Sequence, residues 1–321
     1  MMRLAFILDP LESLKTYKDT SVAIMRAAAA QGHTLYVAQQ GDLFLRHGVV
    51  RLMVRSFEFS ESESWYRLGP AEEIAPAEVD AILMRKDPPF DNEFLYSTYL
   101  LELAVEQGAL VLNNPFAIRD WNEKLSIARF PQYAPTFLVT RDQPRIRQFL
   151  AEHGDIVVKP LDGMGGSSVF RLTQTDPNIG VILETITNFG QRTIMAQRYV
   201  PEIVAGDKRI ILIHGEPVPY ALARIPQGGE TRGNLAAGGK GVAQPLTARD
   251  REIAATVGNT LRENGLFLVG LDVIGDYLTE INVTSPTGMV EIAAQTDCNP
   301  ANLFIDALST HQDVLRYRRS L

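Results

Sequence analysis

Two acids and one amide in the last fifth of the chain have the residue types and spacing of a metal site. Asp272 lies between apolar residues in one alternating run, and Glu280 and Asn282 alternate with apolar residues in the next. Such alternation is typical of β-strands with one buried face. Carboxylate and amide oxygens on one sheet face are ligands for hard cations, above all Mg²⁺, which in such sites usually also holds phosphate. The stretch therefore predicts a magnesium and phosphate site, although a solvent-facing hairpin with ordinary polar residues explains it equally well on its own.

The turn between the two runs decides whether these side chains meet. A plain two-residue loop at Gly275-Asp276 would send Glu280 to the apolar face, because a slip of one residue inverts every side chain. A three-residue loop or a β-bulge would instead place Asp272 opposite Glu280 and Ile274 opposite Leu278. We predict this second arrangement. The apolar residues that would then share the core face are Leu271, Val273, Ile281 and Val283.

A glycine-rich loop between two predicted strands has the composition of a phosphate site. Lys159 ends the strand before it, and Ser167 follows it. Glycines let backbone N–H groups crowd around an anion. The loop is not a Walker loop, which would run from a strand to a helix and end in GK[ST]. A flexible hairpin tip is the structural alternative. The residues of the loop are Gly163, Met164, Gly165 and Gly166.

Further candidates follow this loop along the chain. Residues 194–201 read as a strand running into a connector, which can offer an adenine an apolar slot and backbone hydrogen bonds. Asp207 could bind ribose hydroxyls and Arg209 could reach phosphates. Arg224 lies inside a strand, where a charge is either edge protection or a ligand contact. The connector residues are Gln197, Arg198, Tyr199 and Val200.

The segment 226–241 is long, glycine-dense and nearly free of large apolar side chains. Structureless loops of this length in compact domains are usually lids or disordered linkers. It nearly matches a P-loop at its end, but Asn234 stands where the first glycine is required and Gly241 where Ser or Thr is required. We predict a lid that carries Arg232 and Asn234 over a reaction from which water must be excluded.

The elements that must position these residues begin with a βαβ pattern. The strand 3–8, a helix over 19–31 and the strand 33–38 indicate a parallel sheet, with an antiparallel excursion over 49–60 and a polar loop region over 60–76. No G-x-G-x-x-G follows the first strand, which argues against a dinucleotide fold. Arg85 follows the strand 79–84, where open α/β sheets bind ligands. It could clamp a substrate carboxylate, or it could be a surface residue in a local ion pair.

Composition limits the class of protein. The 321 residues are too many for one typical core and suggest two or three domains. The net charge of -7 argues against general binding to nucleic acid or to anionic membranes. The apolar run 3–8 is too short for a signal peptide, and no stretch has the length of a membrane span. The single cysteine, Cys298, fits a reducing compartment, and we expect a cytoplasmic protein.

These features together suit phosphoryl transfer, in which catalysis is mostly positioning and charge neutralisation. They are the lysines, the arginines, the glycine loop, the metal cluster made only of oxygen ligands, and the lid. At this point the chain resembles the ATP-grasp ligases, and within them the bacterial glutathione synthetases. The resemblance covers nearly the whole chain. The runs that carry it are 84–90, 122–124, 159–166, 221–241 and 270–286.

The resemblance implies a fold and a division of the chain. It implies an α/β (α+β) protein with the ATP-grasp fold, in which an N-terminal Rossmann-like domain covers residues 1–122. A central subdomain with the glycine loop and lid character would cover 123–200. A C-terminal subdomain with an antiparallel sheet would cover 201–321 and would carry the catalytic loop 225–241 and the metal hairpin.

The resemblance also implies ligands and roles. ATP would be held at its phosphates by Lys124, Lys159, Arg209 and the loop Gly163–Gly166, at its adenine by Gln197–Val200 and at its ribose by Asp207. Two Mg²⁺ ions, with Mn²⁺ as an alternative, would be bound by Asp272, Glu280 and Asn282. The residues that would face the peptide substrate or the transferring phosphoryl group are Arg85, Arg224, Arg232, Asn234 and Ser285, and those given catalytic roles are Arg209, Arg224, Arg232 and Asn234. The implied assembly is a homo-oligomer, a tetramer with a dimer as the alternative.

The implied reaction belongs to glutathione biosynthesis. The terminal carboxylate of γ-glutamylcysteine would attack the γ-phosphoryl group of ATP, and the amine of glycine would attack the resulting acyl phosphate, with the lid keeping water away. Two alternatives stay open. Another ATP-grasp ligase would keep the phosphate and metal residues and differ near Arg85 and Ser285. A non-catalytic nucleotide-binding sensor is disfavoured because both acids and the asparagine of the metal cluster are present.

Overall fold

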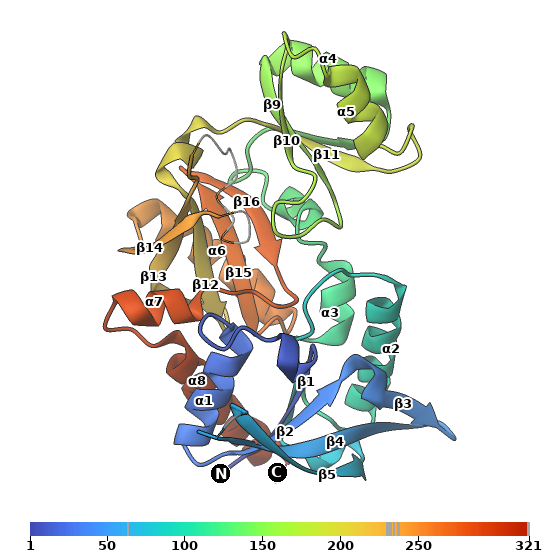
Figure 1. The fold of residues 1–321 in the computed structure, drawn as a ribbon, viewed down its shortest axis with the longest axis vertical. Coiled ribbons are helices and arrows are strands. Elements are labelled where there is room, and N and C mark those ends of the chain that lie inside the picture. The colour runs from blue at the N-terminus through green and yellow to red at the C-terminus, as the bar shows by residue number, and fades with distance from the viewer. Residues whose placement is uncertain (63, 229–232, 234, 236–237, 320–321) are drawn as a thin grey trace.

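The computed structural model describes residues 1–62, 64–228, 233, 235 and 238–319, and in this part of the chain the strands form three sheets (Figure 1). Each sheet is packed by its own helices, and the candidate site residues lie where the sheets face one another. No helix in the described ranges is both long enough and apolar enough to cross a membrane.

The N-terminal sheet has the order β3-β4-β2-β1-β6-β7, with β5 paired to the far side of β4. As predicted from the βαβ pattern, β1 is parallel to β2 and β6. The predicted polar loop over 60–76 is wrong for residues 66–74, which form β5 and pair antiparallel with β4. The elements are β1 (Arg3–Leu8), α1 (Thr20–Ala30), β2 (Thr34–Gln39), β3 (Leu43–Arg46), β4 (Val49–Phe59), β5 (Tyr66–Ile74), β6 (Ala81–Met84), α2 (Asn92–Glu106), β7 (Val111–Leu112) and α3 (Pro115–Asp120).

The central sheet has the order β10-β9-β11-β8, is antiparallel and stands at one end of the molecule (Figure 1). Its two helices pack on one another and on the sheet through a separate core that includes Ile146, Ile156 and Leu183. The glycine loop is the turn between β9 and β10. The elements are β8 (Phe137–Thr140), α4 (Gln143–His153), β9 (Asp155–Pro160), β10 (Phe170–Thr173), α5 (Ile179–Ile186) and β11 (Ile194–Arg198).

The C-terminal sheet is antiparallel in the order β14-β13-β12-β15-β16. The helix α6 starts at a capping box, where Thr247 and Asp250 bond reciprocally, and it buries Ile253, Val257 and Leu261 against the sheet. The elements are β12 (Asp207–Ile213), β13 (Glu216–Ile225), β14 (Lys240–Pro245), α6 (Ala248–Glu263), β15 (Leu268–Ile274), β16 (Tyr277–Asn282), α7 (Met289–Gln295) and α8 (Pro300–Arg319).

The hairpin of β15 and β16 combines the two arrangements considered from the sequence. The turn is a two-residue loop, so the predicted pairing of Ile274 with Leu278 is wrong. The register shifts beyond it, and Asp272 lies opposite Glu280 as predicted. The extra residue is Thr279, which forms a β-bulge, a feature found often beside active sites. The predicted core face is confirmed, since Leu271, Val273, Ile281 and Val283 belong to one buried cluster.

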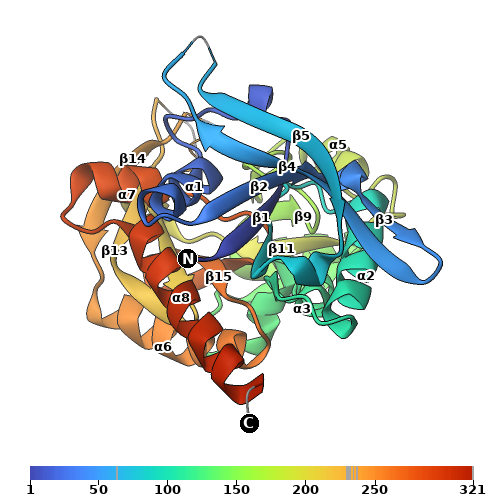
Figure 2. The same cartoon turned by 90° about the horizontal axis from the view of Figure 1, so that it is seen from below.

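The first and last parts of the chain pack together. Helix α8 lies along α1, and Phe304, Ile305 and Leu308 share a buried cluster with Ile24 and Met25 (Figure 2).

A buried asparagine connects the N-terminal and C-terminal sheets. The Asn113 side chain donates to the carbonyls of Leu268 (2.8 Å) and Val283 (2.7 Å) and accepts from two backbone N–H groups of the same segment. Because both the amide nitrogen and the amide oxygen of Asn113 are hydrogen-bonded to backbone groups of the C-terminal sheet and its hairpin, the asparagine fixes the N-terminal sheet against the hairpin that carries the acids.

Candidate active site

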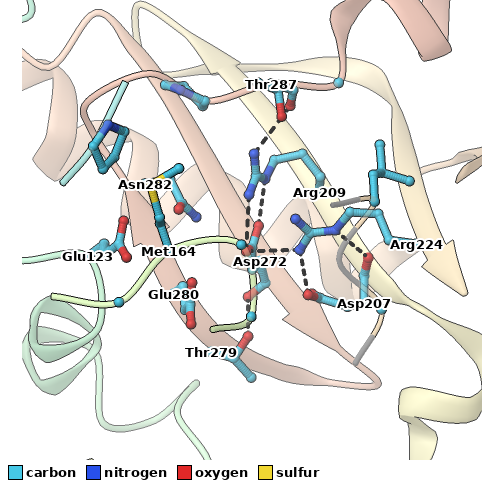
Figure 3. Close-up of a pocket in the computed structure, with 18 of the residues that line it drawn as sticks. Glu123, Met164, Asp207, Arg209, Arg224, Asp272, Thr279, Glu280, Asn282 and Thr287 are labelled. Carbon is cyan, nitrogen blue, oxygen red and sulfur yellow. Dashed lines mark hydrogen bonds and ion pairs between the residues drawn. The ribbon is translucent and has the colours of Figure 1, made fainter. Parts of the chain in front are cut away.

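One cavity of about 610 Å³ lies between the three sheets and is lined by all of them. The N-terminal sheet contributes the segment before α1, the central sheet contributes the glycine loop and the end of β11, and the C-terminal sheet contributes β12, β13, β15 and β16. Figure 3 shows the charged side chains of the C-terminal sheet pointing into this space.

Two arginines hold Asp272 on the floor of the cavity. Strand pairing places Arg209 directly opposite Asp272, and the guanidinium donates to both carboxylate oxygens at 2.6 and 3.1 Å. Arg224 lies 2.9 Å from the same carboxylate (Figure 3). Burial alone would raise the pKa of Asp272, but the two arginines outweigh it and hold that pKa below its ordinary value.

Asp207 shares Arg224 with Asp272 and has the opposite pKa shift. Its carboxylate accepts from Arg224 at 2.5 Å, while its second oxygen, Oδ1, is buried without a hydrogen-bond partner in the described chain. Burial is the largest cause, and together with the charges of Asp272 and Glu280 it outweighs Arg224 and raises the pKa of Asp207 to about 7.

Two lysines hold Glu280. Lys159 lies 3.2 Å from its carboxylate and Lys124 lies 3.9 Å from it. Burial would raise the pKa of Glu280, but the two lysines outweigh it and lower that pKa. Burial would lower the pKa of Lys124, but the charges of Glu280 and Glu123 outweigh it and raise that pKa. The bulge adds a further contact, because the carbonyl of Thr279 accepts from Lys159 at 3.3 Å.

The predicted metal ligands share the cavity wall. Asp272, Glu280 and Asn282 all line it, and the two acids are cross-strand neighbours. No group of three or more His, Cys, Asp or Glu that could hold a metal occurs among the described residues. Two carboxylates and an amide do not form a closed cage, but they suit Mg²⁺, which keeps waters and phosphate oxygens as its other ligands. The donor set therefore fits magnesium bound together with a phosphate.

The glycine loop lies against the same site. Met164, Gly165 and Gly166 line the cavity, and both of these glycines have positive φ, at 61° and 80°, which larger residues rarely adopt. The carbonyl of Gly163 accepts from Lys124 at 2.6 Å, so that a lysine of the site also fixes the loop.

The predicted adenine connector also lines the cavity, through Gln197, Arg198, Tyr199 and Val200. Gln197 is 5% exposed, and its Nε2 is buried without a partner in the described chain. A buried amide donor that faces a cavity is expected to bond to a ligand.

The predicted lid is described only in part, and Arg232 and Asn234 lie outside the described residues. Gly233 and Leu235 line the cavity. A Cβ on Gly233 would meet the Arg224 carbonyl oxygen at 2.2 Å, so only glycine fits at this approach. The predicted end of the loop is wrong by two residues, because β14 already begins at Lys240.

Arg85 is buried beside the cavity, at 5% exposure, and is not a surface residue. Its Nε donates to Ser21 and its Nη2 to the Pro286 carbonyl, both at 3.0 Å, while Nη1 has no partner in the described chain. Ser285 lines the cavity, and its hydroxyl donates to the Arg85 carbonyl at 3.4 Å. Arg85 thus joins the start of α1 to the segment before α7.

Sequence reasoning missed several charged residues that line the cavity, namely Asp9, Lys15, Lys18, Asp19, Asp87, Glu123 and Glu291. Lys18 and Asp19 carry a helix-start signal and nothing more, and Glu291 lies in a short helix with no motif around it. Asp87 and Glu123 had a signal, since they lie in the runs 84–90 and 122–124 on which the resemblance rests.

Comparison with known protein families decides what kind of site this is. Residues 2–119 match the model of the "Prokaryotic glutathione synthetase, N-terminal domain", and residues 123–297 match that of the "Prokaryotic glutathione synthetase, ATP-grasp domain". The chain belongs to the prokaryotic glutathione synthetase family. The resemblance seen in the sequence is therefore confirmed, as is the prediction of an ATP-dependent carbon–nitrogen ligase.

Similar proteins agree over nearly the whole chain. The chain is 60% identical to the glutathione synthetase of Nitrosomonas europaea, over 99% of this chain and all of the relative. It is 55% identical to that of Pseudomonas aeruginosa, over 96% of this chain and 98% of the relative. These relatives support the main functional prediction, a glutathione synthetase.

Solved structures of similar shape confirm the ATP-grasp fold. D-cycloserine synthetase DcsG superposes with a TM-score of 0.67 at 16% identity, over 97% of this chain and 99% of that one. The ATP-grasp ligase PsnB, solved with its minimal precursor, Mg and ADP, superposes with a TM-score of 0.63 at 16% identity, over 97% and 98%. At this level of identity the likeness concerns the fold alone.

Proposed function

We propose that this member of the family joins γ-glutamylcysteine to glycine at the expense of ATP, releasing ADP and phosphate. The observation that carries the proposal is the convergence, in one cavity, of two pairs of opposite charge with a glycine loop. In the pairs Arg209–Asp272 and Lys159–Glu280, the cations suit phosphates and the acids suit a divalent ion. One cavity can therefore hold a triphosphate and a metal at the same time.

We assign the nucleotide to the side formed by the central sheet. Lys124, Lys159, Arg209 and the loop Gly163–Gly166 would bind its phosphates. The Gln197–Val200 connector would bind adenine, which the unpartnered Nε2 of Gln197 supports. Asp207 would accept from a ribose hydroxyl, which its unpartnered Oδ1 supports.

Asp272, Glu280 and Asn282 would hold Mg²⁺, and we propose two ions, with Mn²⁺ as an alternative. The metal would neutralise charge on the transferring phosphoryl group. Since both acids are paired with cations, Arg209 and Lys159 would turn from the acids to the phosphates as nucleotide binds.

The proposed reaction has two steps. A carboxylate oxygen of the cysteine residue attacks the γ-phosphorus of ATP, the bond to ADP breaks, and an acyl phosphate forms. The neutral amine of glycine then attacks the acyl carbon, phosphate leaves, and a proton is released. Arg224, Arg232, Asn234 and Arg209 would stabilise the charge on the transferring group, with Arg85 and Ser285 on the peptide side.

Several finer features remain part of the proposal. We propose domain limits after residues 122 and 200, which the matched family regions 2–119 and 123–297 support at the first limit. The segment 225–241 would act as the catalytic lid, the protein would form a tetramer or a dimer, and it would reside in the cytoplasm. The single cysteine, which is not in a disulfide, supports the last of these.

The test is phosphate release with ATP, Mg²⁺ and γ-glutamylcysteine, with and without glycine. We expect release that depends on glycine and matches the tripeptide formed, with alanine and β-alanine as weaker acceptors. Glu280→Gln should abolish release, whereas Glu106→Gln, an exposed acid on α2, should leave it unchanged. Release that is independent of glycine, or a better amine acceptor in the panel, would overturn the assignment.

A further inference from the structure

The glycine loop has a tip, residues 164–166, that lines the cavity, and a stem, residues 161–163, that joins the tip to β9. The stem belongs to the central sheet by sequence, yet its contacts lie elsewhere. The side chain of Leu161 packs against the buried cluster of the C-terminal sheet. The carbonyl of Gly163 accepts from Lys124 at 2.6 Å. The position of the tip in the cavity therefore depends on how the stem is attached to the C-terminal part of the protein.

Asn122 makes a second polar attachment of the stem. Its Nδ2 donates to the carbonyl of Leu161 at 3.0 Å. Its Oδ1 accepts from the backbone N–H groups of Lys124 at 3.1 Å and Leu125 at 2.9 Å, at the start of the short 3₁₀ helix Leu125–Arg129. Because the two bonds to the oxygen fix the plane of the half-buried amide, its nitrogen is held pointing toward the loop.

The residue after Asn122 is bonded to the metal hairpin. The carbonyl of Glu123 accepts from the Ile281 N–H at 2.8 Å. Ile281 lies on β16 between Glu280 and Asn282, two of the three proposed metal ligands. The segment 122–124 is therefore bonded to the glycine loop on one side and to the strand of the metal ligands on the other.

We propose that Asn122 is a positioning residue for the nucleotide, which holds the glycine loop at a fixed distance from the metal hairpin. The inference rests on the part of the proposed function that assigns the phosphates to the loop and Mg²⁺ to the hairpin. Asn122 does not line the cavity, so it acts through the Leu161 carbonyl and not by contact with a ligand. Lys124 also holds the stem, but its ammonium would bind a phosphate when nucleotide is present. The bond from the neutral Asn122 amide can persist throughout the cycle.

The test measures the affinity for ADP with Mg²⁺ after Asn122 is replaced by serine. A serine hydroxyl can accept from the same backbone N–H groups, but it is too short to reach the Leu161 carbonyl. Asn114→Ser is the matched control, because Asn114 caps α3 through the N–H groups of Phe116 and Ala117 and no hydrogen bond in the described ranges joins it to the loop. The Kd for ADP should rise by roughly three- to tenfold in Asn122→Ser, as expected for one neutral hydrogen bond. It should change by less than about twofold in Asn114→Ser.

Two further measurements distinguish positioning from a general loss of stability. The KM for ATP should rise by the same factor as the Kd, while kcat and the KM for glycine change by no more than about twofold. Amide hydrogen exchange over 161–168 without nucleotide should be faster by roughly three- to tenfold, while β9 and β11 keep their protection. An unchanged affinity for ADP, or loop exchange equal to that of the wild type, would overturn the proposal even if the variant unfolds more easily.

Should Asn122→Ser fail to fold, Asn122→Asp takes its place, because it keeps the shape and the accepting oxygen and loses the donor. Since the added charge would itself repel ADP, the measurement for this variant is loop exchange without nucleotide, and unchanged exchange would overturn the proposal. The proposed function fails separately. A wild-type protein that binds ADP but does not join γ-glutamylcysteine to glycine would refute the proposed reaction alone, because neither ADP binding nor amide exchange requires the peptide or glycine.

Discussion

Replacing Asp207 by asparagine should stabilise the ligand-free protein at pH 8 relative to pH 5, although it removes one side of a buried ion pair. Asp207 bonds to Arg224, but Arg224 also lies 2.9 Å from Asp272, so the arginine keeps an acidic partner in the variant. Burial and the neighbouring acids raise the pKa of Asp207 to about 7. The charged form is therefore less favourable here than in water.

The direction in which the stability difference changes with pH follows from proton linkage. Between the ordinary pKa of an aspartate, near 4, and the raised value of about 7, the folded protein binds more protons at this site than the unfolded chain does. The contribution of Asp207 to stability is therefore fully present below pH 4 and is lost as the pH rises to 7. Three pKa units at 1.36 kcal/mol each give an upper limit of about 4 kcal/mol for the unfolding free energy lost between pH 4 and pH 7.

The assay is urea denaturation of both proteins at pH 5, 6, 7 and 8 without ligands. The difference in unfolding free energy, variant minus wild type, should rise by up to about 2.7 kcal/mol from pH 5, because about two of the three pKa units lie between pH 5 and 7, and it should level off above pH 7. Taking this difference cancels every group that both proteins share. A difference that falls with pH would mean that the Arg224 pair favours the ionised Asp207, and would refute the reasoning.

Three further predictions concern the catalytic cycle. Lys159→Met, which removes the cation 3.2 Å from Glu280, should raise the KM for ATP by roughly ten- to a hundredfold in initial-rate measurements, while Arg145→Met, an exposed cation of the same subdomain, should not. Gly233→Ala places a Cβ 2.2 Å from the Arg224 carbonyl oxygen and should raise ATP hydrolysis relative to ligation, measured as phosphate against tripeptide; an unchanged ratio would show that the backbone relaxes there. Chelation of divalent ions should abolish turnover and added Mg²⁺ should restore it, so activity that persists in excess chelator would contradict the magnesium site.

Local patterns in the sequence predicted the acids of the site well. The alternation around Asp272 and Glu280 is a property of each strand by itself, and it placed each acid on the polar face of its own strand. The register shift beyond the turn is what brings the two faces together. The position of the bulge could not be predicted in this way. Thr279 is held by Lys159 from another sheet, and the neighbouring Leu278 N–H donates to the carbonyl of Tyr133. Contacts between distant segments decide such a register.

The same limit explains the residues that were missed or misjudged. The surface ion pair considered for Arg85 is wrong, because Arg85 is buried and its partners in the described chain are Ser21 and Pro286, which no spacing in the sequence relates to it. Its contact with a substrate carboxylate stays a prediction. Glu291 gave no signal, because what distinguishes it is a buried carboxylate oxygen that has no hydrogen-bond partner in the described chain, and only the folded structure shows this. The glycine loop and the strands on either side of it were predictable because turn residues and periodicity mark them directly.

The packing of α8 along α1 has a consequence for how the protein is made. Ile24 and Met25 leave the ribosome long before Phe304 and Ile305, which cover them in the folded protein. The apolar face of α1 therefore stays uncovered until α8 has been translated. Binding by a chaperone that recognises nascent apolar segments would be favoured during this interval, and release would coincide with the arrival of α8.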